Sequence, residues 1–508
     1  MKLVSLRLLT VVFAFLVLQT SVLSQTTGAI AGTITDANGA AVPAATVLVT
    51  GEGGQKFTVV TNDSGAYRIP SVATGVYTVT ITAANFKKSI VENVKVDVGL
   101  PTTVNAVLEP GEVTETVVVT SGGEVLQTQT ATVGTTITGR QINETPTASR
   151  DALDLVGLLP GTASVGAPRR SSINGLPKGA LSITIDGVDV QDNLLRSSDG
   201  YFTYVRPRVD AIEEVTVSTA NPGAETGGDG AIQIRFVTRR GTNDYRGTLY
   251  WQHRDESLNA NYWYQNRDGQ RDSNGKAFRQ KIRLNQFGGA FGGPIPFLNF
   301  KDSRKQWYDT GRDRRFFFVN YEEFRLPQSQ ARTRVILSPL AEQGIYQYIV
   351  GGNVQQVNLY SIAASNGQLS TPDPTIASML SRIRTAVNSE GTITPISGSP
   401  GLFNYNFSPT GDSVRKFLAL RLDFNLTKNH SLEFVTNQQD FVPSKDFLNS
   451  QDERFPGFPS YTQGSVRDSY STALRSTFSK NVVNEVRYAV STGLSTFSAG
   501  ISPADFAY

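Results

Sequence analysis

The chain of 508 residues contains no cysteine and only two histidines, His253 and His430. Without cysteine it can form no disulfide, no thiolate nucleophile and no cysteine-ligated metal site. Two histidines are too few to build a histidine metal cluster or a catalytic triad. We therefore expect no catalytic residue, no bound metal and no cofactor.

The chain also lacks an excess of charge of either sign. Its formal net charge is +3, and without Lys2 and Arg7 of the N-terminal leader, 45 basic residues face 44 acidic ones. A nearly neutral chain has no electrostatic footprint for DNA or RNA. Nucleic acid is therefore not an expected partner.

Long apolar runs are missing beyond residue 24. Before that point, Leu8–Leu18 follows the two basic residues, and Val22-Leu23-Ser24 precedes Gln25 as a cleavage site. About 11 apolar residues are too few to cross about 30 Å of hydrocarbon, which argues against a transmembrane anchor. Residues 1–24 are predicted to be a signal peptide, and any membrane span in the remainder must be a β-barrel.

Aromatic residues are scarce in the first half of the chain and common in the second. All three tryptophans, 21 of the 27 phenylalanines and all but five of the 18 tyrosines follow Gly247. This division indicates that residues 244–508 lie in a different solvent from the residues before them.

Residues 418–427 alternate between two kinds of side chain. The even positions are apolar and the odd positions are small or polar: Leu418, Leu420, Leu422, Phe424 and Leu426 against Ala419, Arg421, Asp423, Asn425 and Thr427. One face suits lipid and the other a watery lumen, as in a transmembrane β-barrel. A tight turn at residues 428–430 reverses the chain, and the unit recurs at residues 474–490 around a turn at 479–481. The longest connection, residues 326–413, is predicted to face outward, to contain one short helix at Pro374–Val387, and to capture a ligand.

Residues 25–110 read as a small β-sandwich, because short strands alternate with polar turns such as Asp36–Gly39. This module serves either as a spacer or as a glycan- or protein-binding face. In residues 111–123, a β-branched extended run precedes the joint Gly122-Gly123. The run Glu115, Thr116, Val117, Val118, Val119 and Thr120 is either the last strand of the sandwich or a segment that pairs with another protein.

Residues 124–243 are expected to form an α/β domain. Strands are predicted at Thr132–Thr138, Ile183–Ile185, Glu213–Thr219 and Ala231–Thr238, and a helix at Asp151–Leu159 capped by Ser149. Asp186-Gly187 signals a hairpin turn, and a second tight turn is expected at Gly227, Gly228 and Gly230. The carboxylates of Asp186, Asp189 and Asp192 lack the spacing of a calcium loop, so they are assigned to turns and solvent rather than to calcium.

The segments DAIEEVTV, AETGGDGAIQIRFVTRRGTND and YRGTLY (residues 210–217 and 224–250) resemble the junction between plug and barrel in TonB-dependent outer-membrane receptors of the Oar-like group. Residues 314–324 and 283–295 resemble early barrel strands of that group. Residues 25–110 resemble carboxypeptidase regulatory-like domains, without any HxxE zinc motif, and ETVVVT at 115–120 resembles a TonB box. Where familiar siderophore receptors carry Arg-Gly-Pro, this chain has Thr219-Ala220-Asn221-Pro222-Gly223, so the plug arginine of that motif is missing.

The resemblance implies a mainly β chain: a small β-sandwich, an α/β plug at residues 124–243, and from residue 244 the N-terminal part of a transmembrane antiparallel β-barrel. Its implied function is ligand-gated, energised uptake across the outer membrane of a Gram-negative cell. The implied partners are the TonB energy-transducing complex, outer-membrane lipid and an extracellular ligand (siderophore, glycan or peptide). The alternative is a barrel-anchored adhesin or assembly factor without transport, while an exported enzyme lacks a catalytic set.

The chain is expected to be incomplete. About 260 residues follow the plug, enough for eight to ten strands of about 10 residues each, whereas the resemblance implies a barrel of 22 strands. A half-barrel would expose two sheet edges to lipid. We therefore expect either the N-terminal part of a longer receptor or a truncated gene product.

Overall fold

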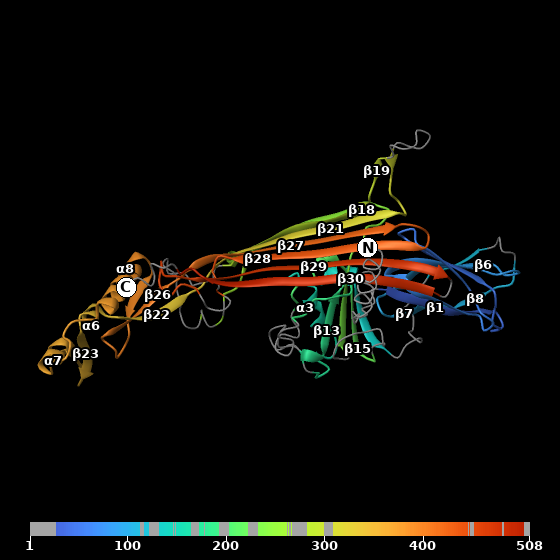
Figure 1. Ribbon diagram of the computed structural model, residues 1–508. Coiled ribbons are helices and arrows are strands. Elements are labelled where there is room, and N and C mark those ends of the chain that lie inside the picture. Colours follow the sequence, from blue (N-terminus) through green and yellow to red (C-terminus); the bar gives the residue numbers. More distant parts are fainter. Residues whose placement is uncertain are drawn as a thin grey trace, which may run out of the picture.

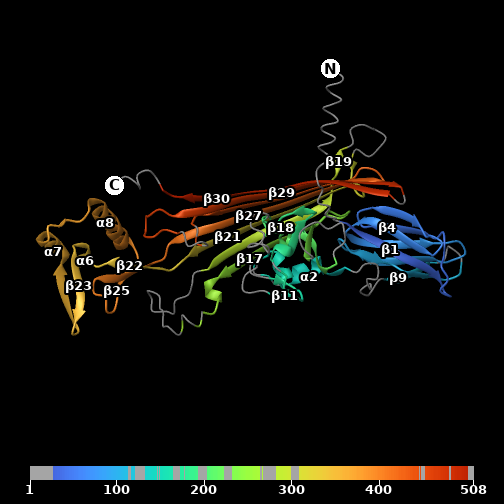
Figure 2. The same ribbon diagram turned by 60° about the horizontal axis from the view of Figure 1, so that its bottom comes forward.

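The computed structural model describes residues 27–111, 116–120, 132–145, 147, 149–163, 172–176, 178–192, 203–221, 232–261, 263, 266, 282–298, 308–445, 447, 452–479 and 482–501. A long curved sheet supports the plug on its inner side, with the sandwich at one end and a small helical module at the other (Figures 1 and 2). The prediction of a mainly β chain is confirmed. The signal peptide, Glu115 and the turns at Gly227, Gly228, Gly230 and 480–481 lie outside the described residues.

The curved sheet, called the wall sheet below, joins its strands in the order β17-β18-β21-β27-β28-β29-β30, and every neighbouring pair is antiparallel. Its strands are β17 (Arg246–Asp255), β18 (Arg283–Pro294), β21 (Arg315–Ser329), β27 (Thr410–Asn425), β28 (His430–Pro443), β29 (Tyr461–Ser479) and β30 (Val482–Ala499). Within the described residues the sheet is open, with β17 and β30 at its edges. The described part of the sheet contains seven strands rather than eight to ten, because several are far longer than ten residues and because residues 332–407 build a separate module.

The two faces of the wall sheet differ as the alternation predicts. Ala419, Arg421 and Asp423 are buried on the face toward the plug. On the other face large apolar side chains are exposed, among them Leu249, Trp251, Tyr488 and Leu494. Successive side chains of a strand point to opposite faces of the sheet, so odd and even positions meet different environments.

The turn between β27 and β28 is also as expected. The amide N–H of Leu426 donates to the carbonyl of His430 at 2.9 Å, and Thr427 Oγ1 accepts from the amides of Asn429 and His430 at 3.1 Å each. These bonds close the hairpin and set the register in which Asn425 lies opposite Ser431.

The long connection folds into a module of its own, called the outer module. Its elements are β22 (Arg332–Leu337), α6 (Pro339–Glu342), β23 (Ile345–Val350), β24 (Asn353–Asn358), α7 (Leu359–Ser365), α8 (Pro374–Ser389), β25 (Thr392–Pro395) and β26 (Leu402–Phe407). The expectation of a single helix is wrong, although α8 begins at Pro374 as predicted. Its N-cap Asp373 accepts the amides of Thr375 and Ile376, and Tyr405 and Phe407 anchor a small core that pairs β22 with β26 and β25.

Two further two-stranded pairs lie away from the outer module: β19 (Phe297–Leu298) with β20 (Tyr308–Asp309), and β11 (Thr162–Ala163) with β12 (Ser172–Ile173) in the plug. None of the helices within the described ranges is long and apolar enough to cross a bilayer.

The N-terminal module is the sandwich that the sequence predicts. One sheet joins β1 (Thr27–Asp36) with β4 (Ala66–Ala73), β7 (Pro101–Thr103) and β8 (Ala106–Leu108). The other has the order β3 (Lys56–Val60), β2 (Thr46–Gly51), β5 (Gly75–Thr82), β6 (Lys88–Val96) and β9 (Thr116–Thr120). Ile30, Ile34 and Ile81 are fully buried between the sheets, and the Tyr67 hydroxyl donates to the carbonyl of Val104 at 2.8 Å.

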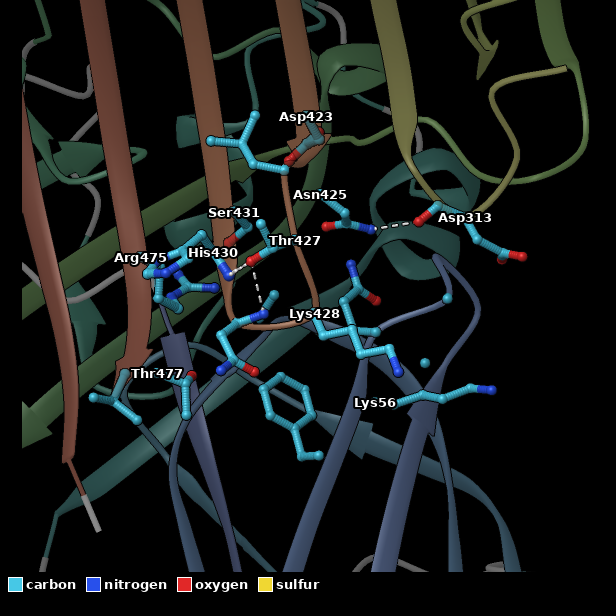
Figure 3. A pocket seen from close by; sticks show the side chains of 18 of the residues that line it. Lys56, Asp313, Asp423, Asn425, Thr427, Lys428, His430, Ser431, Arg475 and Thr477 are labelled. Carbon is cyan, nitrogen blue, oxygen red and sulfur yellow. Dashed lines mark hydrogen bonds between the residues drawn. The ribbon is translucent and has the colours of Figure 1, made fainter. Parts of the chain in front are cut away.

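A cavity of about 1190 Å³ separates the sandwich from the near rim of the wall sheet. Figure 3 shows basic and acidic side chains around it, including Lys56 of the sandwich and Lys428 of the wall. At its edge the Asn425 side-chain amide donates to the carbonyls of Asp313 (2.8 Å) and Gly53 (3.2 Å). Sandwich and wall therefore meet here through a few polar contacts around an open space.

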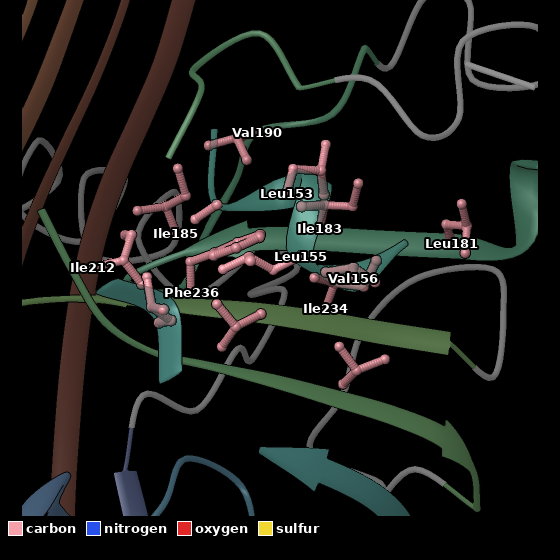
Figure 4. Close-up of a cluster of buried hydrophobic side chains, with 14 of the residues drawn as sticks. Leu153, Leu155, Val156, Leu181, Ile183, Ile185, Val190, Ile212, Ile234 and Phe236 are labelled. Carbon is pink, nitrogen blue, oxygen red and sulfur yellow. The ribbon is translucent and has the colours of Figure 1, made fainter. Parts of the chain in front are cut away.

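The plug is a five-stranded sheet covered by short helices. Its strand order is β10 (Val133–Thr138), β15 (Ile212–Ala220), β16 (Ile232–Thr238), β13 (Leu181–Ile185) and β14 (Val188–Asp189), and β13 runs parallel to β16. Figure 4 shows Leu153, Leu155 and Val156 of α3 (Leu153–Val156) packed over Ile183 and Phe236 of the sheet. The buried residues of this core all come from the plug, so the plug is a folding unit separate from the wall.

The helix predicted at Asp151–Leu159 is reduced to the four residues of α3, and Ser149 is not its N-cap. Asp151 instead forms a β-bridge with Arg208, and the Ala152 amide donates to the Pro207 carbonyl at 2.8 Å. These long-range backbone bonds commit residues 150–152 to the bridge with residues 207–209, so the helix begins later. Among its described residues the plug also has α2 (Gly139–Glu144) and the single turns η2 (Lys178–Ala180) and η3 (Val209–Ala211).

Glu214 of β15 joins the plug to the sandwich. Its Oε1 accepts the Val98 amide at 2.8 Å, and its side chain is buried. Burial raises the pKa of Glu214 to about 8, and the neighbouring Asp97 carboxylate adds to this, whereas the Val98 amide and Lys95 oppose it. The protonated carboxyl is therefore the form that the closed joint favours.

This joint is predicted to weaken as the pH rises. The pKa of Glu214 is raised above the ordinary value of a glutamate, so the joint's stability is fully present below that ordinary value and is lost as the pH rises to about 8. In calorimetry of the whole chain, we expect the melting temperature of the sandwich–plug transition to fall between about pH 5 and about pH 8. Glu214→Gln should remove this slope, and an equal slope in both proteins would contradict the prediction.

Candidate functional site

Two buried charged clusters fasten the plug to the wall sheet. The first is the Glu322 cluster, which comprises Glu322 of β21, Tyr250 of β17, Gln286 of β18 and the plug residues Arg150 and Arg208. Glu322 is fully buried. Its carboxylate accepts hydrogen bonds from Arg208, from Gln286 Nε2 at 2.6 Å and from the Tyr250 hydroxyl at 2.5 Å. Arg150 Nε lies 3.5 Å from the same carboxylate.

The strand period places Glu322 on the plug side of the wall. It shares its face with Phe318 and Asn320, which are also buried. On the plug, Arg150 pairs with Asp210 and stacks over the Tyr250 ring at 3.8 Å, while Arg208 donates to the Ser149 carbonyl at 2.9 Å. The one carboxylate thus ties two separate segments of the plug to three wall strands.

The second cluster centres on the Asp186-Gly187 turn between β13 and β14. Asp186 Oδ1 accepts the Thr238 amide at 3.0 Å, and Arg421 Nη1 lies 3.7 Å from the same oxygen. Arg421 also donates to the Thr238 carbonyl at 3.0 Å, and Arg487 donates to the Asp186 carbonyl at 2.9 Å. Burial raises the pKa of Asp186, although the Arg421 charge opposes the rise.

The wall completes this second cluster with its own acids. Arg421 bonds Asp423 at 3.0 Å and Glu433 at 2.7 Å, and Arg487 bonds Glu433 at 3.0 Å. The two arginines that bind the plug backbone are therefore already paired with carboxylates of the wall. Such contacts are strong while the site is dry and weaken when water enters.

The candidate TonB box has a defined position for its last five residues. Thr116–Thr120 forms β9, parallel to β6, with Ile90 opposite Val118. β9 is the last strand of its sheet, and Val118 is 56% exposed. Within the described residues its outer edge has no strand partner. This segment is thus a strand of the sandwich that also offers a free edge.

Sequence reasoning placed the Asp186-Gly187 turn but missed Arg150, Arg208 and Glu322. The alternation of β21 was the available signal. It places the Glu322 carboxylate on the same face of the strand as aromatic residues, and a carboxylate on such a face needs a partner. The plug arginines come from positions unrelated to the missing Arg-Gly-Pro motif. Among the described residues no group of three or more His, Asp or Glu is arranged to hold a metal.

Removing the Glu322 charge is predicted to loosen the plug. Glu322→Gln leaves Arg208 buried without its carboxylate, and breaking a buried pair in this way costs about 3–5 kcal/mol. Hydrogen exchange of the plug core under increasing urea should show opening at lower denaturant than in the wild type.

Glu323→Gln is the matched control, because the Glu323 side chain bonds only Tyr321 and Arg325 of its own strand among the described residues. Equal shifts in the two variants would show that Glu322 does not fasten the plug.

Comparison with known proteins identifies two modules. Residues 237–506, more than half of the chain, match the family model described as "Outer membrane beta barrel domain", and residues 29–109 match "Carboxypeptidase regulatory-like domain". The TonB-dependent transporter Oar of Myxococcus xanthus is 26% identical over 301 residues, covering 56% of this chain and 26% of that protein. The chain thus spans about a quarter of the length of that curated relative.

Solved structures with a similar arrangement include the outer membrane transporter YddB from Escherichia coli (TM-score 0.41, 10% identity, 68% of this chain and 37% of that one). The ferric enterobactin receptor from Pseudomonas aeruginosa gives a TM-score of 0.37 at 12% identity, over 72% of this chain and 41% of that one. Because the barrel model matches more than half of the sequence, this chain belongs to the outer membrane beta barrel domain family, with a carboxypeptidase regulatory-like domain in front of the barrel.

Proposed function

We propose that this chain is part of a TonB-dependent receptor of the outer membrane, which takes up a ligand through a plugged barrel. The family match and the similarity to a TonB-dependent transporter support this proposal. In this account the outer face of the wall sheet contacts lipid. The plug blocks the bore until the TonB complex displaces it.

The observation that carries the proposal is the kind of contact between plug and wall. The plug has its own apolar core, while the two clusters around Glu322 and Asp186 join it to the wall through ion pairs and hydrogen bonds. A polar interface between two separately stable units can open without unfolding either, because water replaces the lost hydrogen bonds. A structural anchor has no need of such an interface.

The strand β9 is the proposed handle for TonB. A free strand edge is a template for another strand, and backbone pairing then supplies the grip. TonB can add to the outer edge of β9, and force applied there reaches the sandwich first and then the plug through the Glu214 contact. The full box in this proposal is Glu115–Thr120.

Ligand capture is assigned to the outer module and to the side of the plug that faces it. The outer module is fixed to the wall connections by the pair Arg332–Asp452, with contacts at 2.6 and 2.8 Å. It presents exposed apolar side chains on its hairpin, including Tyr346 and Val350. Siderophores, glycans and peptides all remain candidate ligands, because fold does not fix function.

The second candidate function is a barrel-anchored adhesin or assembly factor without transport. The pairing of β9 with β6 favours it, since a sandwich strand needs no TonB role. The two functions differ in whether residues 115–120 bind TonB.

Replacing residues 115–120 with glycine and serine tests this choice while the linker keeps its length. Glycine and serine lack the β-branched side chains that favour an extended strand. We expect the full-length receptor in detergent to lose binding to a purified TonB C-terminal domain by at least about tenfold, or about 1.4 kcal/mol.

The amount of protein in outer-membrane fractions should stay unchanged, which serves as the control for folding and export. Unchanged TonB binding would favour the anchor function instead.

A further inference from the structure

Arg415 of β27 is a cation that the wall holds between two aromatic rings. The strand register puts it directly opposite Phe324 on β21 and Phe441 on β28, all three on the plug side of the sheet. Its guanidinium carbon lies 5.1 Å from the Phe324 ring centre and 4.8 Å from that of Phe441. Stacking on two ring faces fixes the plane of the guanidinium and leaves its N–H edge as the part that can bind a ligand.

Arg415 differs in its partners from three other inward-facing arginines of the wall. Arg421, Arg475 and Arg487 each bond a carboxylate. No carboxylate of the described residues lies within ion-pair distance of Arg415, and its buried Nε has no hydrogen-bond acceptor. A buried guanidinium N–H without an acceptor is costly.

The charges that act on Arg415 are mostly of its own sign. Repulsion comes from Arg206 and Arg208 of the plug and from Arg467 of β29, and the main opposing charge is Asp151. Asp151 lies 3.9 Å from Arg206, and Arg208 is already bonded to Glu322. Both of these carboxylates are therefore already paired with a plug arginine.

The plug contributes its residues from one short segment. Arg206 offers its carbonyl to the Gln439 side chain at 2.8 Å, and Tyr204 offers its carbonyl to Arg467 at 3.3 Å. The Arg467 guanidinium also lies 5.3 Å from the Tyr204 ring centre. Plug and wall thus bring four guanidinium groups, those of Arg206, Arg208, Arg415 and Arg467, to one place at their junction.

We propose that this arginine group binds a carboxylate of the ligand, with Arg415 as the main contact. The planar N–H edge of an arginine matches the two oxygens of a carboxylate in a bidentate pair. An incoming carboxylate supplies both the charge and the acceptors that Arg415 lacks. Because two of the arginines belong to the plug and two to the wall, the bound group contacts both sides of the interface that uptake must open.

The role in uptake rests on the proposed receptor function, but binding itself does not. Citrate is a suitable probe, since it carries several carboxylates, and chloride at equal ionic strength accounts for general screening. Calorimetric titration of the full-length receptor in detergent, without TonB, should show citrate binding. A failure of TonB-driven uptake would leave this result unchanged, so the two ideas fail separately.

Arg415→Gln should weaken citrate binding by at least about tenfold, the loss expected for a charge-assisted hydrogen bond. Lys416→Gln is the matched control: it removes the same charge from the adjacent residue, whose side chain is exposed on the opposite face, and should leave the affinity within about twofold. Arg415→Lys keeps the charge but not the planar fork, so its affinity should lie between wild type and Arg415→Gln.

The proposal is overturned if the wild-type receptor binds citrate no better than Arg415→Gln does. It is also overturned if Lys416→Gln loses as much affinity. Fold integrity of each variant is checked by the temperature at which the barrel loses its compact mobility in detergent gels, which should not fall in Arg415→Gln because a repelled cation has been removed.

Discussion

The buried carboxylate of Glu322 is the interaction on which the relation between plug and wall depends. This fully buried group accepts hydrogen bonds from one plug arginine and from two wall side chains, and a second plug arginine lies 3.5 Å away. Removing a charge from water is costly, so the group is tolerated only because its partners come from both units. The positions of the two units are therefore specified together, although the plug has a core of its own.

The two-residue period of the strands puts the Glu322 carboxylate on the plug side of the wall. The same period keeps apolar side chains on the outer side. On β27, odd positions such as Arg421 meet the plug, while even positions such as Leu420 point away from it. The same period puts Arg415 between two rings and Glu433 between two arginines. A shift of one residue in any strand would exchange the two faces, which is why the register of long strands is strongly specified.

The sequence was sufficient for the features that depend on local pattern. Alternation at residues 418–427 predicted the wall, and Asp186-Gly187 predicted a turn. No local pattern could show that this turn contacts Arg421. The helix at Asp151–Leu159 was overestimated, because backbone bonds with Pro207 and Val209 hold its first residues in a β-bridge. Arg150, Arg208 and Glu322 are far apart in sequence, so a single chain without an alignment gives no sign that they meet. The internal structure of the outer module was missed for a similar reason, since its small core unites distant segments.

The central claim is that the wall sheet has an apolar environment on one face and the plug on the other. Because the chain has no cysteine, single cysteines at residues 418–423 can each carry a spin label without background. In native outer membranes, labels at Leu418, Leu420 and Leu422 should be accessible to oxygen, and labels at Ala419, Arg421 and Asp423 should not, with a period of two residues. Equal accessibility at odd and even positions, or access of a water-soluble relaxation agent to all six, would contradict the account.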